Sequence, residues 1–124
     1  MSGLGQLLHR LTATRQELDA ADERRASMLQ GATACAEVAP RTRAKVAGIV
    51  SALTYRPRGV APALVAQLFD GSATIDLIFL GRHDVPGVEP GRRLVAEGMV
   101  AEEDGRRVMF NPDYQLIARS GVHA

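Results

Sequence analysis

The residues best suited to acid–base chemistry are His83 and Asp84, which are neighbours in the stretch Gly-Arg-His-Asp. A histidine next to a carboxylate can move a proton when both groups point at the same substrate. Neighbouring side chains at the end of a strand point in different directions, so adjacency in the sequence does not make a site. The sequence also contains no nucleophile elbow, Walker loop or dinucleotide-binding glycine motif. It therefore predicts no catalytic residue and no enzyme.

Residues that could bind a metal or form a disulfide are few. Cys35 is the only cysteine, so the chain can form no internal disulfide. The histidines His9, His83 and His123 lack the spacing of zinc ligands. We expect Asp70, which precedes a glycine, to accept hydrogen bonds from the backbone amides of its own turn and not to bind a metal. The sequence predicts no metal site and no cofactor.

Length and charge narrow the class of protein. The chain has 124 residues and a formal net charge of +1. This size suits one domain with an extension, and the charge gives no overall field that would attract nucleic acid. The first residues lack the basic and apolar regions of a signal peptide, and no run approaches the roughly 20 apolar residues needed to span a bilayer. We therefore expect a soluble cytoplasmic protein that does not bind a membrane.

Residues 1–31 have the pattern of an amphipathic helix. Leu4, Leu11 and Leu18 recur at intervals of seven on one face, and Gly31 is a suitable stop. Two interpretations of this leucine stripe are open. It packs on the rest of the domain, or it pairs with another copy or another protein as a short coiled coil. Residues 32–43 are expected to form a linker.

Five apolar runs after residue 43 predict strands. An Asp-Gly pair at Asp70 supplies the positive φ values that a tight hairpin turn requires. Gly48 lies within the first run and predicts a bulge or bend, which a small closed barrel needs. Residues 55–59, which include Pro57, are expected to form a loop together with Pro62, and residues 81–91 a crossover. The strands are expected at Ala44–Leu53, Ala63–Phe69, Ala73–Leu80, Arg93–Glu102 and Arg107–Phe110.

Six short motifs of the chain carry a family resemblance. They are Val46-Ala-Gly-Ile-Val50, Leu68-Phe-Asp-Gly71, Ile75-Asp-Leu-Ile-Phe79, Pro90-Gly91, Val95-Ala-Glu-Gly98 and Asn111-Pro-Asp-Tyr114. Over residues 44–118 the chain resembles the OB-fold nucleic-acid-binding family, in particular small actinobacterial members and the OB domains of the RecG-type wedge and the tRNA-anticodon-binding type. The resemblance implies an all-β, five-stranded OB-fold Greek-key barrel at 44–118. An N-terminal α-helix precedes it, and a flexible tail at 119–124 follows.

The same resemblance implies a function. OB-folds bind single strands across the face of the second and third strands and the loops beside it. We therefore expect a non-enzymatic protein that binds single-stranded DNA or RNA weakly and without sequence specificity. Arginines would contact phosphates, and an acidic Asp76 on the same face would repel them. The residues implied are Tyr55, Arg56 and Arg58 in the first loop, Gln67 and Thr74 on the strands, Arg82 at their end, and Arg106 and Arg107 in the second loop.

Aromatic residues, which strong single-strand binders place on that face, are scarce. The chain has no Trp, two Tyr and three Phe, and we assign Phe69, Phe79 and Phe110 to the core. We expect Tyr114 to pack against the barrel, which leaves Tyr55 as the one aromatic residue to stack on a base. The alternative interpretation is a protein–protein interaction adaptor that uses the barrel and the leucine-striped helix. Its partner, or a second copy of the chain, would bind through Leu4, Leu11 and Leu18.

Overall fold

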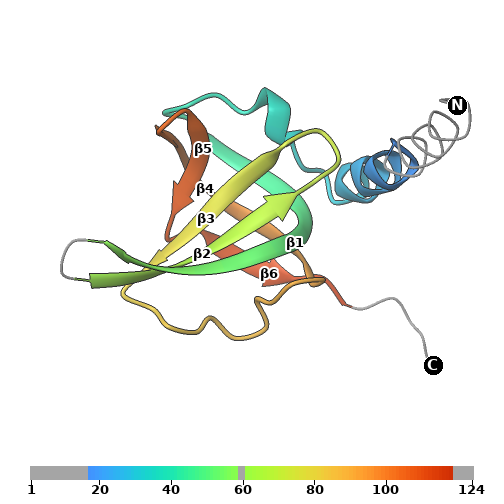
Figure 1. Ribbon diagram of the computed structural model, residues 1–124. Coiled ribbons are helices and arrows are strands. Elements are labelled where there is room, and N and C mark those ends of the chain that lie inside the picture. The colour runs from blue at the N-terminus through green and yellow to red at the C-terminus, as the bar shows by residue number, and fades with distance from the viewer. Residues whose placement is uncertain (1–16, 59–60, 119–124) are drawn as a thin grey trace, which may run out of the picture.

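The computed structural model describes residues 17–58 and 61–118 (Figure 1). Helical residues run from 17 to 29 and form the N-terminal helix. The stripe positions Leu4 and Leu11 and the expected tail at 119–124 lie outside the described residues. The other elements are η1 (Cys35–Glu37), β1 (Arg43–Arg58), β2 (Ala61–Phe69), β3 (Thr74–Leu80), β4 (Arg93–Glu103), β5 (Arg106–Phe110) and β6 (Asp113–Leu116).

Five of these strands close into a ring. They follow the order β1-β2-β3-β5-β4, and β1 pairs with β4 to complete the ring. Neighbouring strands are antiparallel except β3 and β5, which run parallel. The short β6 pairs with the first half of β4, on the edge that β5 occupies along the second half. The prediction of a mostly β chain with five ring-forming strands after an N-terminal helix is confirmed.

β1 bends because it has two partners. Residues 43–49 pair with β4 and residues 49–58 pair with β2. The register shifts between Val50 and Ala52, which is a β-bulge that increases the local twist. A Cβ atom at Gly48 would lie 2.4 Å from the carbonyl oxygen of Phe69, so glycine lets the two backbones approach this closely. The predicted irregularity in the first strand is confirmed, with the bulge a few residues after the glycine.

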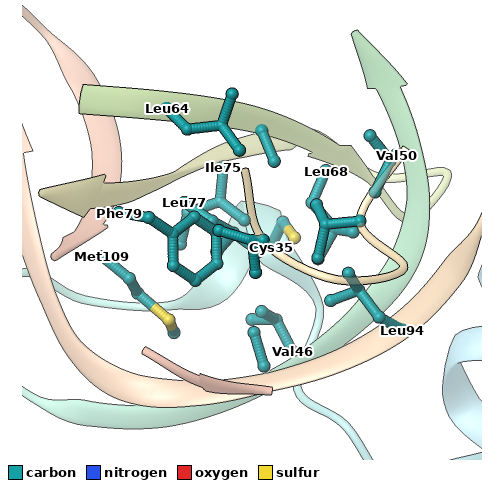
Figure 2. Close-up of a cluster of buried hydrophobic side chains, with 14 of the residues drawn as sticks. Cys35, Val46, Val50, Leu64, Leu68, Ile75, Leu77, Phe79, Leu94 and Met109 are labelled. Atoms are coloured by element: carbon teal, nitrogen blue, oxygen red, sulfur yellow. The ribbon is translucent and has the colours of Figure 1, made fainter. Parts of the chain in front are cut away.

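The core fills the inside of the ring (Figure 2). Leu68 and Ile75 are fully buried there, and Cys35 of η1 reaches the same cluster from outside the sheet. Phe79 is 4% exposed, which confirms its assignment to the core. Phe69, at the end of β2, is half-buried.

Phe110 is not part of this core, and its assignment from the sequence was wrong. Its side chain is 37% exposed. β5 runs parallel to β3 with Phe110 paired to Ile78, and paired residues of neighbouring strands lie on the same face. Ile78 stands between Leu77 and Phe79, which belong to the core. Ile78 and Phe110 therefore face outwards.

The expectation of a loop at residues 55–59 is wrong for its described part. β1 continues to Arg58 and pairs with β2 along this whole stretch, and the resulting hairpin projects beyond the ring (Figure 1). Two prolines had suggested a loop. They are paired with each other, Pro57 with Pro62, so both missing amide hydrogens fall on one rung and the ladder continues past them.

The N-terminal helix lies against the turn between β2 and β3 (Figure 1). A Cβ atom at Gly71 would lie 2.1 Å from the carbonyl oxygen of Ala20, so the backbone of the helix touches the turn. Arg24 pairs with Asp70 at the same place, with 3.3 Å between Nη1 and Oδ2. The side-chain oxygen Oδ1 of Asp70 accepts from the amide of Ser72 at 2.9 Å. The expected cap of this turn is thereby confirmed.

Residues 32–42, most of the expected linker, run along the ring. The amide of Arg41 donates to the carbonyl of Val100 at 2.7 Å, and the amide of Val100 donates to the carbonyl of Thr42 at 2.8 Å. In η1 the amide of Cys35 donates to the carboxylate of Asp70 at 2.8 Å. This segment is therefore tied both to β4 and to the turn that the helix contacts.

Candidate nucleic-acid interface

The outer face of β1, β2, β3 and β5 carries a groove. Its residues come from alternate positions of these strands and therefore share one face. The register pairs Ala52 with Gln67, and Gln67 with Asp76. The hollow has a volume of about 260 Å³ and is called the outer groove here. It is lined by Ala52, Thr54, Arg56, Val65, Gln67, Asp76 and Arg106.

Next to the outer groove the same face is apolar. Val65 belongs both to the groove and to a second buried cluster, which is separate from the core inside the ring. Two large apolar side chains nearby reach solvent: Leu80, paired with Ala63, is 40% exposed, and Phe110, paired with Ile78, is 37% exposed. The face therefore joins charged groups to an apolar surface. The other members of the cluster are Ala63, Ile78 and Val108, with Ala101 packed against it.

Arg106 and Asp76 form a two-point ion pair in the outer groove. Nε donates to Oδ2 at 2.9 Å and Nη2 donates to Oδ1 at 3.0 Å. Asp76 is buried, whereas Arg106 is half-exposed. The hydrogen bond to Asp76, and then its charge, raise the pKa of Arg106 above the usual value. The expected repulsion of phosphate by Asp76 needs correction, because its charge is neutralised by Arg106, whose Nη1 takes no part in the pair.

The bulge in β1 orients Gln67. The hydroxyl oxygen of Ser51 lies 3.2 Å from the carbonyl oxygen of Gln67 and 3.1 Å from its Oε1, and it donates to one or the other. When Oε1 is the acceptor, the amide nitrogen of Gln67 is left to donate to a ligand. Arg56 and Thr54 add a guanidinium and a hydroxyl from β1. The groove therefore offers mainly hydrogen-bond donors, a composition suited to anions.

A second, smaller hollow adjoins the outer groove and shares Arg106 with it. Its volume is about 150 Å³. Thr74 and Arg107 line it together with Ala73 and Gly105. Arg107 also donates from Nη2 to the carbonyl of Ala36, next to Cys35 in η1, at 3.0 Å. Of the residues implied by the resemblance, Arg56, Gln67 and Arg106 therefore meet in the outer groove, and Thr74 and Arg107 lie beside it.

Tyr55 points to the other side of the β1–β2 hairpin from Arg56. It is paired with Leu64, whose side chain belongs to the core. Its ring stacks on His83, with centroids 5.1 Å apart and planes 23° apart, and its hydroxyl oxygen lies 2.8 Å from Nδ1 of His83. Arg82, which is exposed, precedes this histidine. Tyr55 and Arg82 are thus absent from the lining of the outer groove.

Sequence reasoning missed Thr54 and the partner of Asp76. Thr54 could have been found from the sequence. If the first strand is extended past Leu53 as far as Arg56, alternation places Thr54 and Arg56 on the same face. Asp76 and Arg106 are 30 residues apart in the sequence, and no local sequence pattern predicts that they pair. The side chain of Arg58 lies outside the described part of the chain.

The comparisons with known proteins give the chain no family. No protein-family model matches it, and no curated protein matches it either. Over residues 17–58 and 61–118, no three His, Cys, Asp or Glu side chains are placed to hold a metal ion together. Within the same described residues, no helix is long and apolar enough to cross a membrane.

Proposed function

We propose that the chain is a non-enzymatic protein that binds single-stranded DNA or RNA along the outer groove, weakly and without sequence specificity. The observation that carries the proposal is the make-up of this groove. Arg56, Gln67 and Arg106 line one hollow, and the exposed apolar side chains of Leu80 and Phe110 lie on the same face. Guanidinium groups suit phosphates, and flat apolar surface suits bases. A single strand presents both kinds of group side by side.

The strand order supports an OB-fold for the ring. The order β1-β2-β3-β5-β4, closed by pairing of β1 with β4, fits a five-stranded Greek-key barrel. OB-folds bind oligonucleotides across the face of their second and third strands and the adjoining loops. The outer groove lies on the corresponding face, between the far half of β1 and the start of β5. The fold and the groove thus favour the same class of ligand.

Few cations face the groove, so the affinity should be low. Arg56 is exposed, while Arg106 already shares its charge with Asp76. For single strands, each neutralised phosphate contributes about −0.7 to the slope of log K against log salt. Two fully available arginines would give a slope of about −1.4; because Arg106 is paired with Asp76, we expect a shallower slope. Such a protein binds weakly at low salt, and its affinity falls further as the salt concentration rises.

Bases would lie on the apolar part of the face. Leu80 and Phe110 are the large apolar side chains that reach solvent there. A base stacked on an aromatic side chain gains about 1–3 kcal/mol. Because every base has a flat face, this contact does not select a sequence.

Fluorescence anisotropy of labelled oligodeoxythymidine and oligouridine tests the proposal. The wild-type protein should bind at low salt and lose affinity as salt rises to about 0.2 M. Arg56→Ala should weaken binding several-fold. The control is Arg43→Ala, which removes an arginine at the other end of β1 that pairs with Glu97 and Asp113. No binding at low salt, or equal losses in the two variants, would contradict the proposal and favour a protein–protein adaptor.

A further inference from the structure

A hollow separate from the outer groove lies between the N-terminal helix and the ring. Its volume is about 500 Å³, within the range of about 300–1,000 Å³ that is typical of small-molecule sites. It is called the helix hollow here. Three segments that are far apart in the sequence form it: the end of the helix, the start of β4 and the residues after β6. Its lining includes Ala26, Leu29, Gln30, Arg92, Arg93 and Ile117.

One positive charge of the helix hollow is already balanced by the helix. Arg93 donates from Nε to Oε2 of Glu23 at 3.3 Å and from Nη2 to Oε1 of the same carboxylate. This ion pair holds the helix against the start of β4. Among the described residues that line the hollow, none is acidic. A second cation in the hollow therefore meets no counter-charge in this lining.

Arg92 is that second cation. It is half-buried, and its Nε atom is buried and has no hydrogen-bond partner within the described part of the chain. Buried polar atoms are nearly always hydrogen-bonded in proteins. The Nε–Nη edge of a guanidinium group fits the two oxygens of a carboxylate, and Arg106 binds Asp76 in this way in the same protein. Arg92 is therefore suited to bind a carboxylate from outside the chain.

A second unpartnered polar atom lies next to the helix hollow. Ser27 is 2% exposed, and among the described residues its Oγ atom has no partner. It lines a small space that shares Ala26, Arg93 and Ile117 with the helix hollow. Gln30, three residues further on, adds a side-chain amide with two donor hydrogens. Hydrogen-bond donors thus accompany the cation of Arg92.

Apolar side chains supply the rest of the described lining that the argument needs. Leu29 of the helix is 85% exposed, and Ala26 and Ile117 lie in the same hollow. Removal of such apolar surface from water favours binding. The helix hollow therefore places a cation with donor groups beside an apolar wall.

We propose that the helix hollow binds a small carboxylic acid with a short apolar chain, in its ionised form. The carboxylate accepts hydrogen bonds from Arg92, and the chain packs on Leu29 and Ile117. The single cation without a counter-charge suits an anion of one charge. A phosphate monoester, with a charge of about −1.5 to −2 near neutral pH, fits this balance less well. The site shares no lining residue with the outer groove, so it is independent of nucleic-acid binding.

Three probes separate the role of the charge from that of the chain. Octanoate has both, octanol has the chain alone and acetate has the charge alone. In NMR titrations of the full chain, octanoate should bind more tightly than either and shift the amide signals of Gln30, Arg92 and Ile117. Absence of octanoate binding, or shifts confined to the outer groove, would overturn the proposal. Inorganic phosphate that bound as tightly as octanoate would also overturn it.

Arg92→Ala tests the carboxylate contact. It should weaken octanoate binding about tenfold or more, because hydrogen bonds to charged groups are the stronger ones. Binding of octanol should not change. The control is Arg82→Ala, which removes an exposed arginine from the crossover segment and does not line the helix hollow. Equal losses of octanoate affinity in the two variants would overturn the proposal.

Leu29 and Met28 form a matched pair for the apolar wall. They are neighbours on the helix, and their side chains are 85% and 59% exposed, so neither substitution should unfold the protein. Of the two, Leu29 lines the helix hollow and Met28 does not. Leu29→Ser should weaken octanoate binding several-fold, whereas Met28→Ser should leave it unchanged. Equal affinities of the two variants for octanoate would contradict the proposed position of the chain.

Discussion

The backbone amide of Cys35 donates a 2.8 Å hydrogen bond to the carboxylate of Asp70, a residue 35 positions later in the chain. The same carboxylate accepts from the amide of Ala73 at 3.2 Å and pairs with Arg24. One buried side chain thereby joins η1, the β2–β3 turn and the N-terminal helix. This cluster should control how firmly the end of the ring is closed.

Asp70→Asn should lower the free energy of unfolding by about 2–3 kcal/mol. The carboxylate has two acceptor oxygens and an amide has one, so the substitution leaves a buried backbone amide without a partner, at a cost of about 1–3 kcal/mol. The pairing with Arg24 is lost as well. Urea denaturation measures the effect. The control is Asp104→Asn in another Asp-Gly turn, where Asp104 is exposed and has a φ of 52°. This substitution should lower the free energy of unfolding by less than about 0.5 kcal/mol. Similar losses of stability in the two variants would contradict the role of Asp70.

Stability should also fall in acid through Asp70. Burial alone would raise the pKa of this carboxyl, but hydrogen bonds from Ser72, Cys35 and Ala73 outweigh burial and lower the pKa. The contribution is complete above the unfolded-state pKa of about 3.9 and is lost as the pH falls through the lower pKa of the folded state. Thermal melting from neutral to acidic pH should show a steeper loss for the wild type than for Asp70→Asn. Identical slopes would assign the acid sensitivity to other carboxylates.

Gly48→Ala should destabilise the ring by about 2–3 kcal/mol or more. A Cβ atom there would lie 2.4 Å from the carbonyl oxygen of Phe69, and backbone displacements of this kind cost about 1–3 kcal/mol. Gly98 is the matched control, since it is also a mid-strand glycine. A Cβ atom at Gly98 meets Pro112 at an ordinary 3.4 Å, so Gly98→Ala should be near neutral. Chemical denaturation compares the two; a larger loss for Gly98→Ala would disprove the packing argument.

Substitution of Arg106 and substitution of its partner Asp76 should have opposite effects on the affinity for single strands. Arg106→Ala removes a cation and leaves a carboxylate unpaired in the outer groove, so it should weaken binding more than Arg56→Ala. Asp76→Asn frees the guanidinium and should strengthen binding at low salt. Glu97→Gln on β4 makes the same change of net charge away from the groove. If Asp76→Asn and Glu97→Gln changed the affinity measured by anisotropy equally, the change in net charge alone would explain the gain, and the release of Arg106 would not be needed.

The sequence predicted the architecture well where the signals were local. The Asp-Gly pair at Asp70 predicts a turn, and Gly48 predicts an irregular strand, without knowledge of what each residue contacts, and both features are present. Pro57 and Pro62 led to the wrong prediction of a loop, because the effect of a proline in a strand depends on the residue opposite it. Here the strand tolerates Pro57 because it is paired with Pro62. Phe110 was misplaced for a similar reason, since its face is set by the parallel pairing with β3.

The candidate site was less accessible to prediction because it depends on distant pairs. Alternation along β1 sends Tyr55 to one side and Arg56 to the other, and a residue assigned to a loop has no such side. The partner of Asp76 is 30 residues away. The helix illustrates the same limit: its leucine period was visible, but its docking through Glu23 and Arg24 depends on partners in β4 and the β2–β3 turn.

The buried thiol of Cys35 gives the molecule a reporter of its own opening. Burial first, and then the negative charge of Asp70, raise the pKa of this thiol to about 12. The thiolate is the nucleophile that attacks an alkylating reagent, so Cys35 should react only after η1 has lifted from the ring. The alkylation rate of Cys35 in the native protein therefore reports how often η1 separates from the ring. Because Asp70 holds both η1 and Arg24, any event that pulls the N-terminal helix away from the ring should be recorded as faster labelling of Cys35.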